Sequence, residues 1–247
     1  MDEIERAAAV LLDARRTRRT VAAPNLPDGA AAYAVQARVA QSLGWTGSRW
    51  WKSGGPSRTA EQTHARLPPD GVVSSPADLH RWPFHWRGIE AEVALRLARD
   101  VSAGEAATLD VDSARALIDA MCVSLEIVDS RWTEARDAPA LAKLADLQSH
   151  GALVLGEWVP FDGARDWSAQ RCVVTIGVRA PQTFTGTHSM ADPVAVLPRW
   201  LRHAAGQQPV PAGSVVTTGT WCGLPLAAAG ELVVVAFDGI GEARVQL

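Results

Sequence analysis

Cysteine and long apolar runs are scarce in this sequence. Its three cysteines, Cys122, Cys172 and Cys222, are odd in number, widely separated and without a CxxC pair. This pattern excludes a disulfide framework and is typical of reduced residues in a cytosolic protein. No apolar run approaches the roughly 20 residues that span a bilayer, and the first residues, MDEIERAAAV, are acidic where a signal peptide would be basic. We therefore expect a cytoplasmic protein that does not enter a membrane.

An excess of charge of one sign is also missing. The chain has 24 basic and 27 acidic residues, which gives a formal net charge of -3. The nearest approach to a block of like charge lies at residues 15–19, where four of five residues are arginine. No aromatic residues alternate with these arginines, so we interpret them as the solvated end of a helix. Neither a nucleic acid nor an anionic membrane is expected as a partner.

Phenylalanine and tyrosine are rare, with four and one residues, whereas tryptophan occurs ten times. Tryptophan is favoured both in protein cores and in subunit interfaces, so we interpret these residues as core and contact positions. The chain has 247 residues, of which 47% are hydrophobic. That is enough for one large domain, or for one domain with a small extension.

The first part of the chain predicts helices followed by a turn. Residues 1–19 and 30–43 carry apolar residues at helical spacing. A short strand at 49–52 runs into the string Ser-Gly-Gly-Pro-Ser, which must be a turn or loop. The following residues, 66–88, hold four prolines and two glycines without periodicity, which favours a long loop.

We place a domain boundary in this loop. It separates a small N-terminal α/β module, residues 1–75, from a catalytic domain, residues 76–247. Helices come early in the chain and strands late, without an alternation of strand and helix, so the sequence predicts an α+β class or a mostly-β core.

Strands dominate the prediction for the second part. Residues 88–98 alternate between apolar and polar side chains, and residues 123–129 form the next strand. Between them, Asp112 should cap a helix with Leu117, Ile118 and Met121 on its apolar side. Asp192 and Pro193 should open another helix, which Pro198 should kink or shorten. The remaining expected strands are 172–178, 214–218, 231–237 and 242–247, the last two joined by a hairpin turn.

Two glutamates lie on one face of the first of these strands. Glu90 and Glu92 are two residues apart, so their side chains leave the same side, some ~7 Å apart at the backbone. Adjacent carboxylates repel unless a cation compensates them. The cation can be a bound metal, or Arg96 on the same face if that face is simply solvated.

A third carboxylate, Glu126, stands in the middle of the apolar strand 123–129. It is costly there if buried and unpaired, and a salt bridge to Arg131 is the alternative to a metal. Three carboxylates on neighbouring strands would form an all-oxygen site, which suits Mg²⁺ or Mn²⁺ better than zinc. The six histidines show no pair at zinc-ligand spacing.

Several strings of the sequence resemble one known family. Residues 87–100, RGIEAEVALRLARD, resemble the metal-binding strand of the 2-keto-4-pentenoate hydratase and 4-oxalocrotonate decarboxylase branch of the fumarylacetoacetate hydrolase superfamily. Residues 124–131, SLEIVDSR, resemble the strand with the third metal ligand of that branch. The segments 146–156, 216–225 and 230–241 are similar to its Asp-Asn-x-Ser block, its substrate loop and its terminal hairpin. The resemblance runs in order from about residue 7 to the C-terminus.

The resemblance implies a mixed β-roll with a small helical N-terminal module, and Mg²⁺ or Mn²⁺ held by Glu90, Glu92 and Glu126. Such a metal chelates a 2-keto acid and stabilises its enolate as a Lewis acid. It also implies a homodimer or a larger homo-oligomer, with tryptophans between subunits. The catalytic residues it implies are Lys52, Glu90 and Ser149, and the substrate-binding residues are Gly54, Asp146, Gln148, Thr218, Gly219 and Thr220.

Lys52 corresponds to the lysine of the family motif Gly-x-Lys-x-Gly, and it can donate or accept a proton at the enolate carbon. A surface lysine is the alternative. Burial beside Trp50 or Trp51 and a nearby dication would lower its pKa, whereas nearby glutamates would raise it. The direction of the net shift stays open at this point.

Departures from the family pattern leave the substrate open. The amide of the Asp-Asn-x-Ser block is displaced by one position, to Gln148, and the loop after Lys52 reads Ser-Gly-Gly-Pro. We expect first the hydration of a 2-keto-4-pentenoate-type substrate. The alternatives are decarboxylation of 4-oxalocrotonate or oxaloacetate, hydrolysis of an acylpyruvate with His80 or His85 as base, and a non-catalytic partner subunit.

Overall fold

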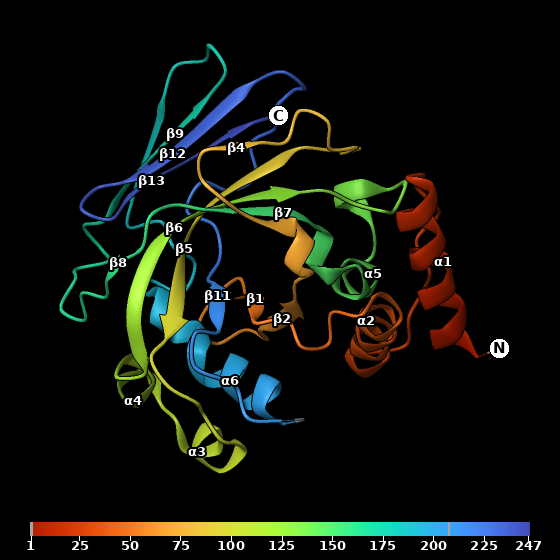
Figure 1. Ribbon diagram of the computed structural model, residues 1–247, viewed down its shortest axis with the longest axis horizontal. Coiled ribbons are helices and arrows are strands. Elements are labelled where there is room, and N and C mark those ends of the chain that lie inside the picture. Colours follow the sequence, from red (N-terminus) through yellow and green to blue (C-terminus); the bar gives the residue numbers. More distant parts are fainter. Residues whose placement is uncertain (1, 207) are drawn as a thin grey trace.

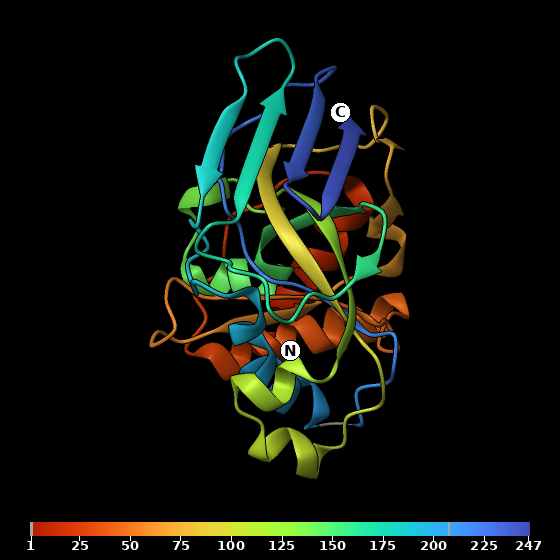
Figure 2. The same ribbon diagram turned by 90° about the vertical axis from the view of Figure 1, so that its left-hand side faces the viewer.

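Two β-sheets and a group of helices make up the structure, a computed structural model that describes residues 2–206 and 208–247. Figure 1 shows the smaller sheet at one end of the molecule and helices α1 (Glu3–Thr17) and α2 (Gly29–Leu43) along one side. In Figure 2 the strands of the smaller sheet stand above most of the helices. This arrangement confirms the predicted α+β class with curled mixed sheets and helices near the N-terminus.

The larger sheet is mixed and has the order β2-β1-β11-β5-β6-β7-β3, with β8 paired to β6 beside this path. Its parallel pairs are β1 with β11 and β3 with β7. These strands are β1 (Trp50–Gly54), β2 (Thr63–Arg66), β3 (Val72–Ser74), β5 (Gly88–Leu97), β6 (Ile118–Val128), β7 (His150–Leu155), β8 (Val159–Pro160) and β11 (Val215–Thr217).

The smaller sheet has the order β10-β9-β12-β13-β4. Its strands are β4 (Ala77–Asp78), β9 (Arg171–Ile176), β10 (Gln182–Thr185), β12 (Leu232–Phe237) and β13 (Gly241–Gln246). The remaining helices are α3 (Ala103–Thr108), α4 (Val111–Arg115), α5 (Ala140–Ala145) and α6 (Leu197–Ala205), with short 3-10 turns η1 (Pro69–Gly71), η2 (Ala135–Asp137), η3 (Leu147–Ser149) and η4 (Pro193–Val196).

The central pair β5 and β6 has one apolar face and one face that carries polar groups. The apolar face contributes Ile89, Val93, Leu125 and Ile127 to a core shared with β9, β12 and β13. Because side chains alternate along a strand, Glu90, Glu92, Ser124 and Glu126 leave the opposite face. The same alternation that builds the core therefore directs these carboxylates towards β1 and the helices.

The N-terminal helices cover a second core. Leu11 of α1, Val35 and Val39 of α2 and Leu144 of α5 pack with Leu153 of β7. Asp2 and Asp28 cap the two long helices by accepting hydrogen bonds from the backbone N–H groups of Glu5 and Ala31. Strands β1 and β2 belong to the same sheet as β5 to β7. The domain boundary at residue 75 remains a prediction.

Two local predictions were wrong. In place of the helix expected from Asp112 through Met121, the structure has only the short helix α4, which ends at Arg115. Its cap is Asp110, which forms a capping box with Ser113. Pairing with β5 draws Ile118 and Met121 into β6 instead. Residues 66–88 are not one long loop, since β3 and β4 pair within the two sheets.

Asp192 caps η4 as expected, through a hydrogen bond from the backbone N–H of Val194. Pro198 lies in the first turn of α6, directly after η4, where its missing N–H needs no partner. In the part of the chain that the structure describes, no helix has both the length and the apolar character that crossing a membrane requires.

Gly156 lies where β13 contacts the strands of the larger sheet, so a substitution there tests this contact. A Cβ added there would lie 2.5 Å from the backbone oxygen of Glu242 and 3.3 Å from that of Val123. We expect Gly156→Ala to lower the free energy of unfolding by about 1–3 kcal/mol through overpacking, measured by urea denaturation. Gly104→Ala is the control, because its Cβ would meet open space in α3. An unchanged denaturation midpoint in Gly156→Ala would contradict the packing described here.

Candidate metal centre

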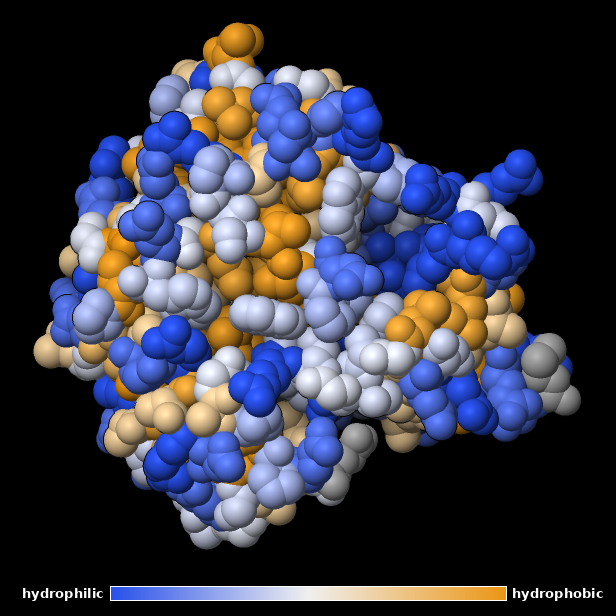
Figure 3. Space-filling model, in the orientation of Figure 1, coloured by the Kyte–Doolittle hydropathy of each residue, from blue (hydrophilic) through white to orange (hydrophobic). Residues whose placement is uncertain are grey.

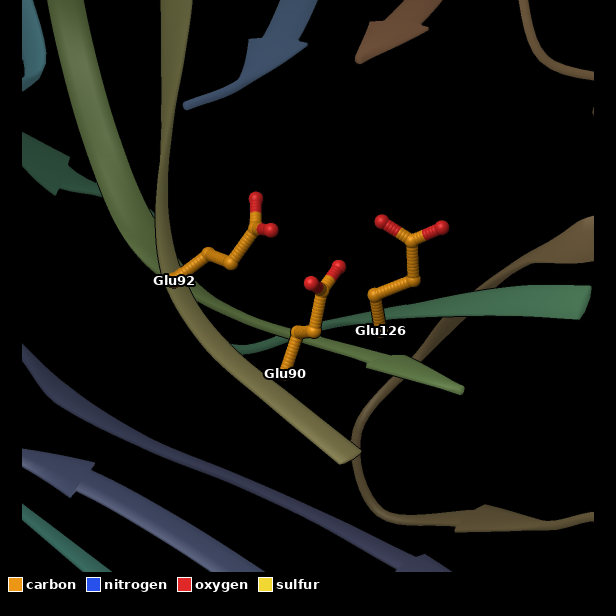
Figure 4. Close-up of side chains that lie close together, drawn as sticks. All are labelled: Glu90, Glu92 and Glu126. Carbon is orange, nitrogen blue, oxygen red and sulfur yellow. The ribbon is translucent and has the colours of Figure 1, made fainter. Parts of the chain in front are cut away.

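Three glutamates converge on the polar face of β5 and β6. Glu90 and Glu126 are direct partners across the two strands, and Glu92 lies opposite Ser124. Figure 4 shows their carboxylates on the same side of the strands, directed towards one another. One oxygen of each lies within 4.8 Å of the other two. Register and alternation alone bring these groups together.

The centre is buried, and its one ammonium group comes from β1. The Nζ atom of Lys52 lies 2.7 Å from Oε1 of Glu126 and 3.7 Å from Oε2 of Glu90. The side chains of Lys52 and Glu90 are 10% and 20% exposed, and that of Glu126 is fully buried. Lys52 is therefore not a surface lysine. It faces three carboxylates, so the centre carries an excess of negative charge when all are ionised.

The two arginines considered as counter-ions lie elsewhere. Arg96 binds Asp119, with its Nη2 2.8 Å from Oδ2. Arg131 binds the buried Asp146, with its Nε 2.7 Å from Oδ1. Neither arginine therefore compensates the glutamates.

The spare oxygens of the carboxylates fit a divalent metal. Oε2 of Glu92 accepts hydrogen bonds from the hydroxyl of Thr217 and from the backbone N–H of Gly219, the latter at 3.0 Å. Oε1 of Glu126 accepts from Lys52, whereas its buried Oε2 has no hydrogen-bond partner among the described residues. Three carboxylates supply hard oxygen ligands, the donors that Mg²⁺ and Mn²⁺ prefer. The residues present therefore fit the metal.

Burial and mutual repulsion separate the pKa values of these groups. Burial raises the pKa of Glu90 to about 8, with Lys52 opposing the shift and Glu92 and Glu126 adding to it. Burial and repulsion from Glu126 also raise the pKa of Glu92. For Glu126, burial raises the pKa, but Lys52 and His150 outweigh it and the net shift is downward.

The pKa of Lys52 is raised in this setting. Burial lowers it, but the combined attraction of Glu126, Glu90 and Glu92 is larger. This settles the direction that the sequence left open: without a metal, the amine is an ammonium at neutral pH. A bound dication would act in the opposite direction.

A cavity of about 350 Å³ opens onto the centre. Of the residues expected from the sequence, it is lined by Lys52, Gly54, Glu90, Glu92, Gln148, Gly219 and Thr220. Thr218 lies outside the lining, where its hydroxyl donates a hydrogen bond to the carbonyl of Val93 at 2.7 Å. Thr217, which was not expected, lines the cavity in its place.

A left-handed turn brings Gln148 into the cavity. Leu147, Gln148 and Ser149 have φ values of 55°, 54° and 60°, a region that non-glycine residues rarely adopt. Asp146, just before the turn, lies outside the lining and binds the side chain and backbone N–H of Arg131. The Oγ atom of Ser149 is buried without a hydrogen-bond partner among the described residues. The ion pair of Asp146 thus anchors the turn that presents Gln148.

Three residues of the centre escaped the sequence analysis. Nδ1 of His150 lies 3.0 Å from Oε1 of Glu126, and Thr217 and Ser189 line the cavity. Only the position of His150 at the start of a strand, directly after Ser149, was a signal for it. His80 and His85 lie outside the cavity lining: His80 binds Asp78 at 2.5 Å, and Nε2 of His85 binds the carbonyl of Arg18 at 3.0 Å.

Metal binding at this centre should depend on pH. Because the pKa of Glu90 is raised to about 8 in the metal-free protein, a metal must displace a proton from it below that pH. The affinity for Mn²⁺ should therefore be highest above pH 8 and fall by about tenfold per pH unit below it. Calorimetric titration between pH 6 and 8.5 measures this slope.

Glu90→Gln is the control for the dependence of Mn²⁺ affinity on pH, because it removes the carboxyl group whose proton the metal displaces. This variant should bind Mn²⁺ more weakly and with a smaller pH dependence, whereas Glu157→Gln on the exposed surface should behave as the parent. An affinity of the parent protein that stays constant from pH 6 to 8 would refute the assignment.

Comparison with solved structures shows the fold. The chain resembles 4-oxalocrotonate decarboxylase from Pseudomonas putida G7 in its complexes with calcium and acetate and with magnesium and adipate. Both comparisons give a TM-score of 0.82 at 18% identity, covering 99% and 100% of this chain and 96% and 98% of the other. 2-Hydroxyhepta-2,4-diene-1,7-dioate isomerase from Mycobacterium marinum gives a TM-score of 0.59 at 15% identity, covering 80% of this chain and 73% of the other. No curated protein matches the sequence.

The model of the fumarylacetoacetate (FAA) hydrolase C-terminal family matches residues 50–247, which is most of the chain. This match covers the three glutamates, Lys52 and the cavity, and it confirms the family predicted from the sequence. The chain belongs to the fumarylacetoacetate hydrolase family.

Proposed function

We propose that this protein is a divalent-metal-dependent lyase that acts on a small 2-keto acid, most directly by hydrating a 2-keto-4-pentenoate-type substrate. The observation that carries the proposal is the contact between the ammonium of Lys52 and Glu126 at 2.7 Å, at the edge of three convergent carboxylates. The cavity is thus lined by the proposed proton donor and by two of the proposed metal ligands, Glu90 and Glu92, and the third, Glu126, adjoins it through its contact with Lys52.

Glu90, Glu92 and Glu126 would hold Mg²⁺ or Mn²⁺. The metal, when bound, would supply a Lewis acid for the oxygens of a 2-keto acid. The protein orients two of these ligands through hydrogen bonds: Thr217 and Gly219 donate to one oxygen of Glu92, and Lys52 and His150 contact one oxygen of Glu126. Such outer contacts orient metal ligands before the substrate arrives.

Lys52 would donate the proton that converts the enolate of the substrate to the keto form. Its raised pKa keeps the amine protonated in the metal-free centre. A bound dication would lower the pKa of the amine and so favour transfer of its proton to the enolate carbon. Gln148 would contact the substrate, since the hydroxyl of Thr63 and the left-handed turn fix the direction of its side chain. The hydroxyls of Ser189 and Thr220 donate to the carbonyls of Gly55 and Gly223, so they offer the substrate tail their oxygens as acceptors.

The charges of the cavity favour a monocarboxylate with a neutral tail. Among the described residues that line it, Lys52 is the only one with a positive side chain. The metal would bind the carboxylate next to the keto group, and Lys52 is already held by Glu90 and Glu126. A second carboxylate on the substrate would then find no cationic side chain, and burying an unpaired charge is costly.

Decarboxylation of a 2-keto diacid is the second candidate. The observation that favours it is the likeness in fold to 4-oxalocrotonate decarboxylase over nearly the whole length of both chains, including a complex of that enzyme with the diacid adipate. The acylpyruvate hydrolase loses support, because His80 and His85 lie outside the cavity lining. A non-catalytic subunit loses support because three carboxylates that could hold a metal lie together beside Lys52. A cytoplasmic homodimer or larger homo-oligomer remains part of this proposal.

Steady-state assays with 2-hydroxypenta-2,4-dienoate, 4-oxalocrotonate, oxaloacetate and an acylpyruvate separate these candidates. A hydratase should convert the dienoate in the presence of Mg²⁺ or Mn²⁺ and lose this activity on chelation. Release of CO₂ from either diacid, with no turnover of the dienoate, would replace the first candidate by the second.

Lys52→Met tests the proton donor. This change keeps the bulk and removes the amine, so kcat should fall by roughly 10²–10⁴, the usual contribution of a general acid or base. Mn²⁺ affinity should be retained or increased, because a competing positive charge leaves the glutamates. Lys143, the other lysine of the sequence, is partly exposed on α5, where its Nζ donates to the carbonyl of Arg136, and Lys143→Met is the matched control. A loss of kcat below about fivefold in Lys52→Met would leave Lys52 a structural residue.

A further inference from the structure

A second cavity lies between the end of α1 and the segments next to β5 and β6. It has a volume of about 240 Å³, and its lining includes Arg15, Arg18, Trp82, Phe84 and Arg131. Among the described residues, none lines both this cavity and the metal centre. Figure 3 shows hydrophilic residues gathered over the region where α1 ends. This cavity has no role in the function proposed above.

Positive charge exceeds negative charge around this cavity. Arg131 is 7% exposed and binds Asp146, and Nη2 of Arg15 lies 3.2 Å from Oδ1 of the same carboxylate. One fully buried carboxylate thus serves two guanidinium groups. The positive charges of Arg15 and Arg131 repel each other strongly where water is excluded. A further anion beside them would reduce this repulsion and would therefore be stabilised.

Hydrogen-bond acceptors are also too few for the donors around this cavity. Nε of Arg15 is buried without a hydrogen-bond partner among the described residues. Burial, followed by repulsion from Arg131, lowers the pKa of Arg15 to about 10. Asp129, the acidic residue of the lining, is already engaged, since its Oδ1 accepts from the backbone N–H groups of His85 and Trp86 at 3.1 and 2.8 Å.

Arg18 adds a third guanidinium at the exposed rim of the cavity. Within residues 2–206 and 208–247, no acidic side chain forms an ion pair with it. Three guanidinium groups from two chain segments therefore surround one space. Planar guanidinium groups bind carboxylates through two parallel hydrogen bonds, which makes them well suited to this anion.

An aromatic wall completes the cavity. The rings of Trp82 and Phe84 are stacked, with centroids 5.9 Å apart and planes at 27°, and Pro83 lies between them in the sequence and in the lining. Aromatic side chains in a lining favour the apolar ring of a ligand as partner. The volume lies below the roughly 300 Å³ at which pockets for drug-sized ligands begin, so it suits a ligand with a single ring.

We propose that this cavity binds a small aromatic carboxylate. Arg15, Arg18 and Arg131 bind the carboxylate, and Trp82 and Phe84 contact the ring. The site is independent of the metal centre and of the reaction assigned to it.

The test is a calorimetric titration of the full-length protein with benzoate, in the presence of EDTA so that no metal recruits the ligand to the glutamates. Benzoate should bind saturably, and Arg18→Gln should weaken it by about tenfold or more, the loss expected for a charged hydrogen-bond donor. Arg16→Gln is the matched control, because Arg16 lies on the same helix, is exposed and binds Asp13 outside the cavity. Its affinity for benzoate should equal that of the parent.

Two further measurements separate the ring from the charge. Trp82→Leu should weaken benzoate, and inorganic phosphate should bind the parent at least about tenfold more weakly than benzoate because it has no ring to contact the wall. Circular dichroism checks that each variant is folded. Absence of saturable benzoate binding, equal binding in the parent and Arg18→Gln, or phosphate binding as tight as benzoate would overturn the proposal.

Discussion

Electrostatic repulsion among three carboxylates, two of them buried and the third partly buried, is the constraint on which this structure depends. Two unit charges 4.8 Å apart repel by about 3.5 kcal/mol at an effective dielectric constant of about 20. Three such pairs approach the whole free energy of unfolding of a typical domain, about 5–15 kcal/mol. Lys52 compensates one charge. The metal-free protein reduces the remainder by holding a proton on Glu90, whose pKa is raised to about 8, and a dication would replace that proton.

The fold holds the carboxylates in place with regular strands on one side of the cavity, and the opposite wall includes a strained turn. Strands β5 and β6 bury apolar residues against the smaller sheet, and this rigid contact fixes the direction of the glutamates. The opposite wall comes from β1, which carries Lys52, and from the left-handed turn that carries Gln148. That turn is unfavourable for non-glycine residues, and the buried ion pair between Asp146 and Arg131 anchors its start. Strain of this kind is characteristic of functional sites.

The sequence predicted those parts of the site that follow from strand periodicity and family resemblance. Alternation placed Glu90 and Glu92 on one face, the position of Glu126 in the middle of an apolar strand made it the third candidate, and the resemblance added Lys52. Where periodicity was ambiguous the prediction was wrong: the apolar positions after Asp112 fit a helix, but pairing with β5 makes them a strand. The sequence analysis named Thr218 as a substrate-binding residue, but Thr217 lines the cavity. This error of one position matters because neighbouring side chains along a strand point to opposite faces. The left-handed turn and the contact of His150 with Glu126 depend on distant segments, and the only local signal for His150 was its position directly after Ser149.

The central claim is that Glu90, Glu92 and Glu126 hold a divalent metal that binds the 2-keto acid. Its most direct test is a crystal structure of the protein soaked with Mn²⁺ and oxalate, a mimic of the chelated substrate, with anomalous diffraction to locate the manganese. We expect one anomalous peak about 2.0–2.2 Å from an oxygen of each glutamate, the distance typical of small divalent ions, with oxalate oxygens completing the shell. Manganese at another position, or oxalate bound in the cavity without manganese at these three residues, would contradict the account.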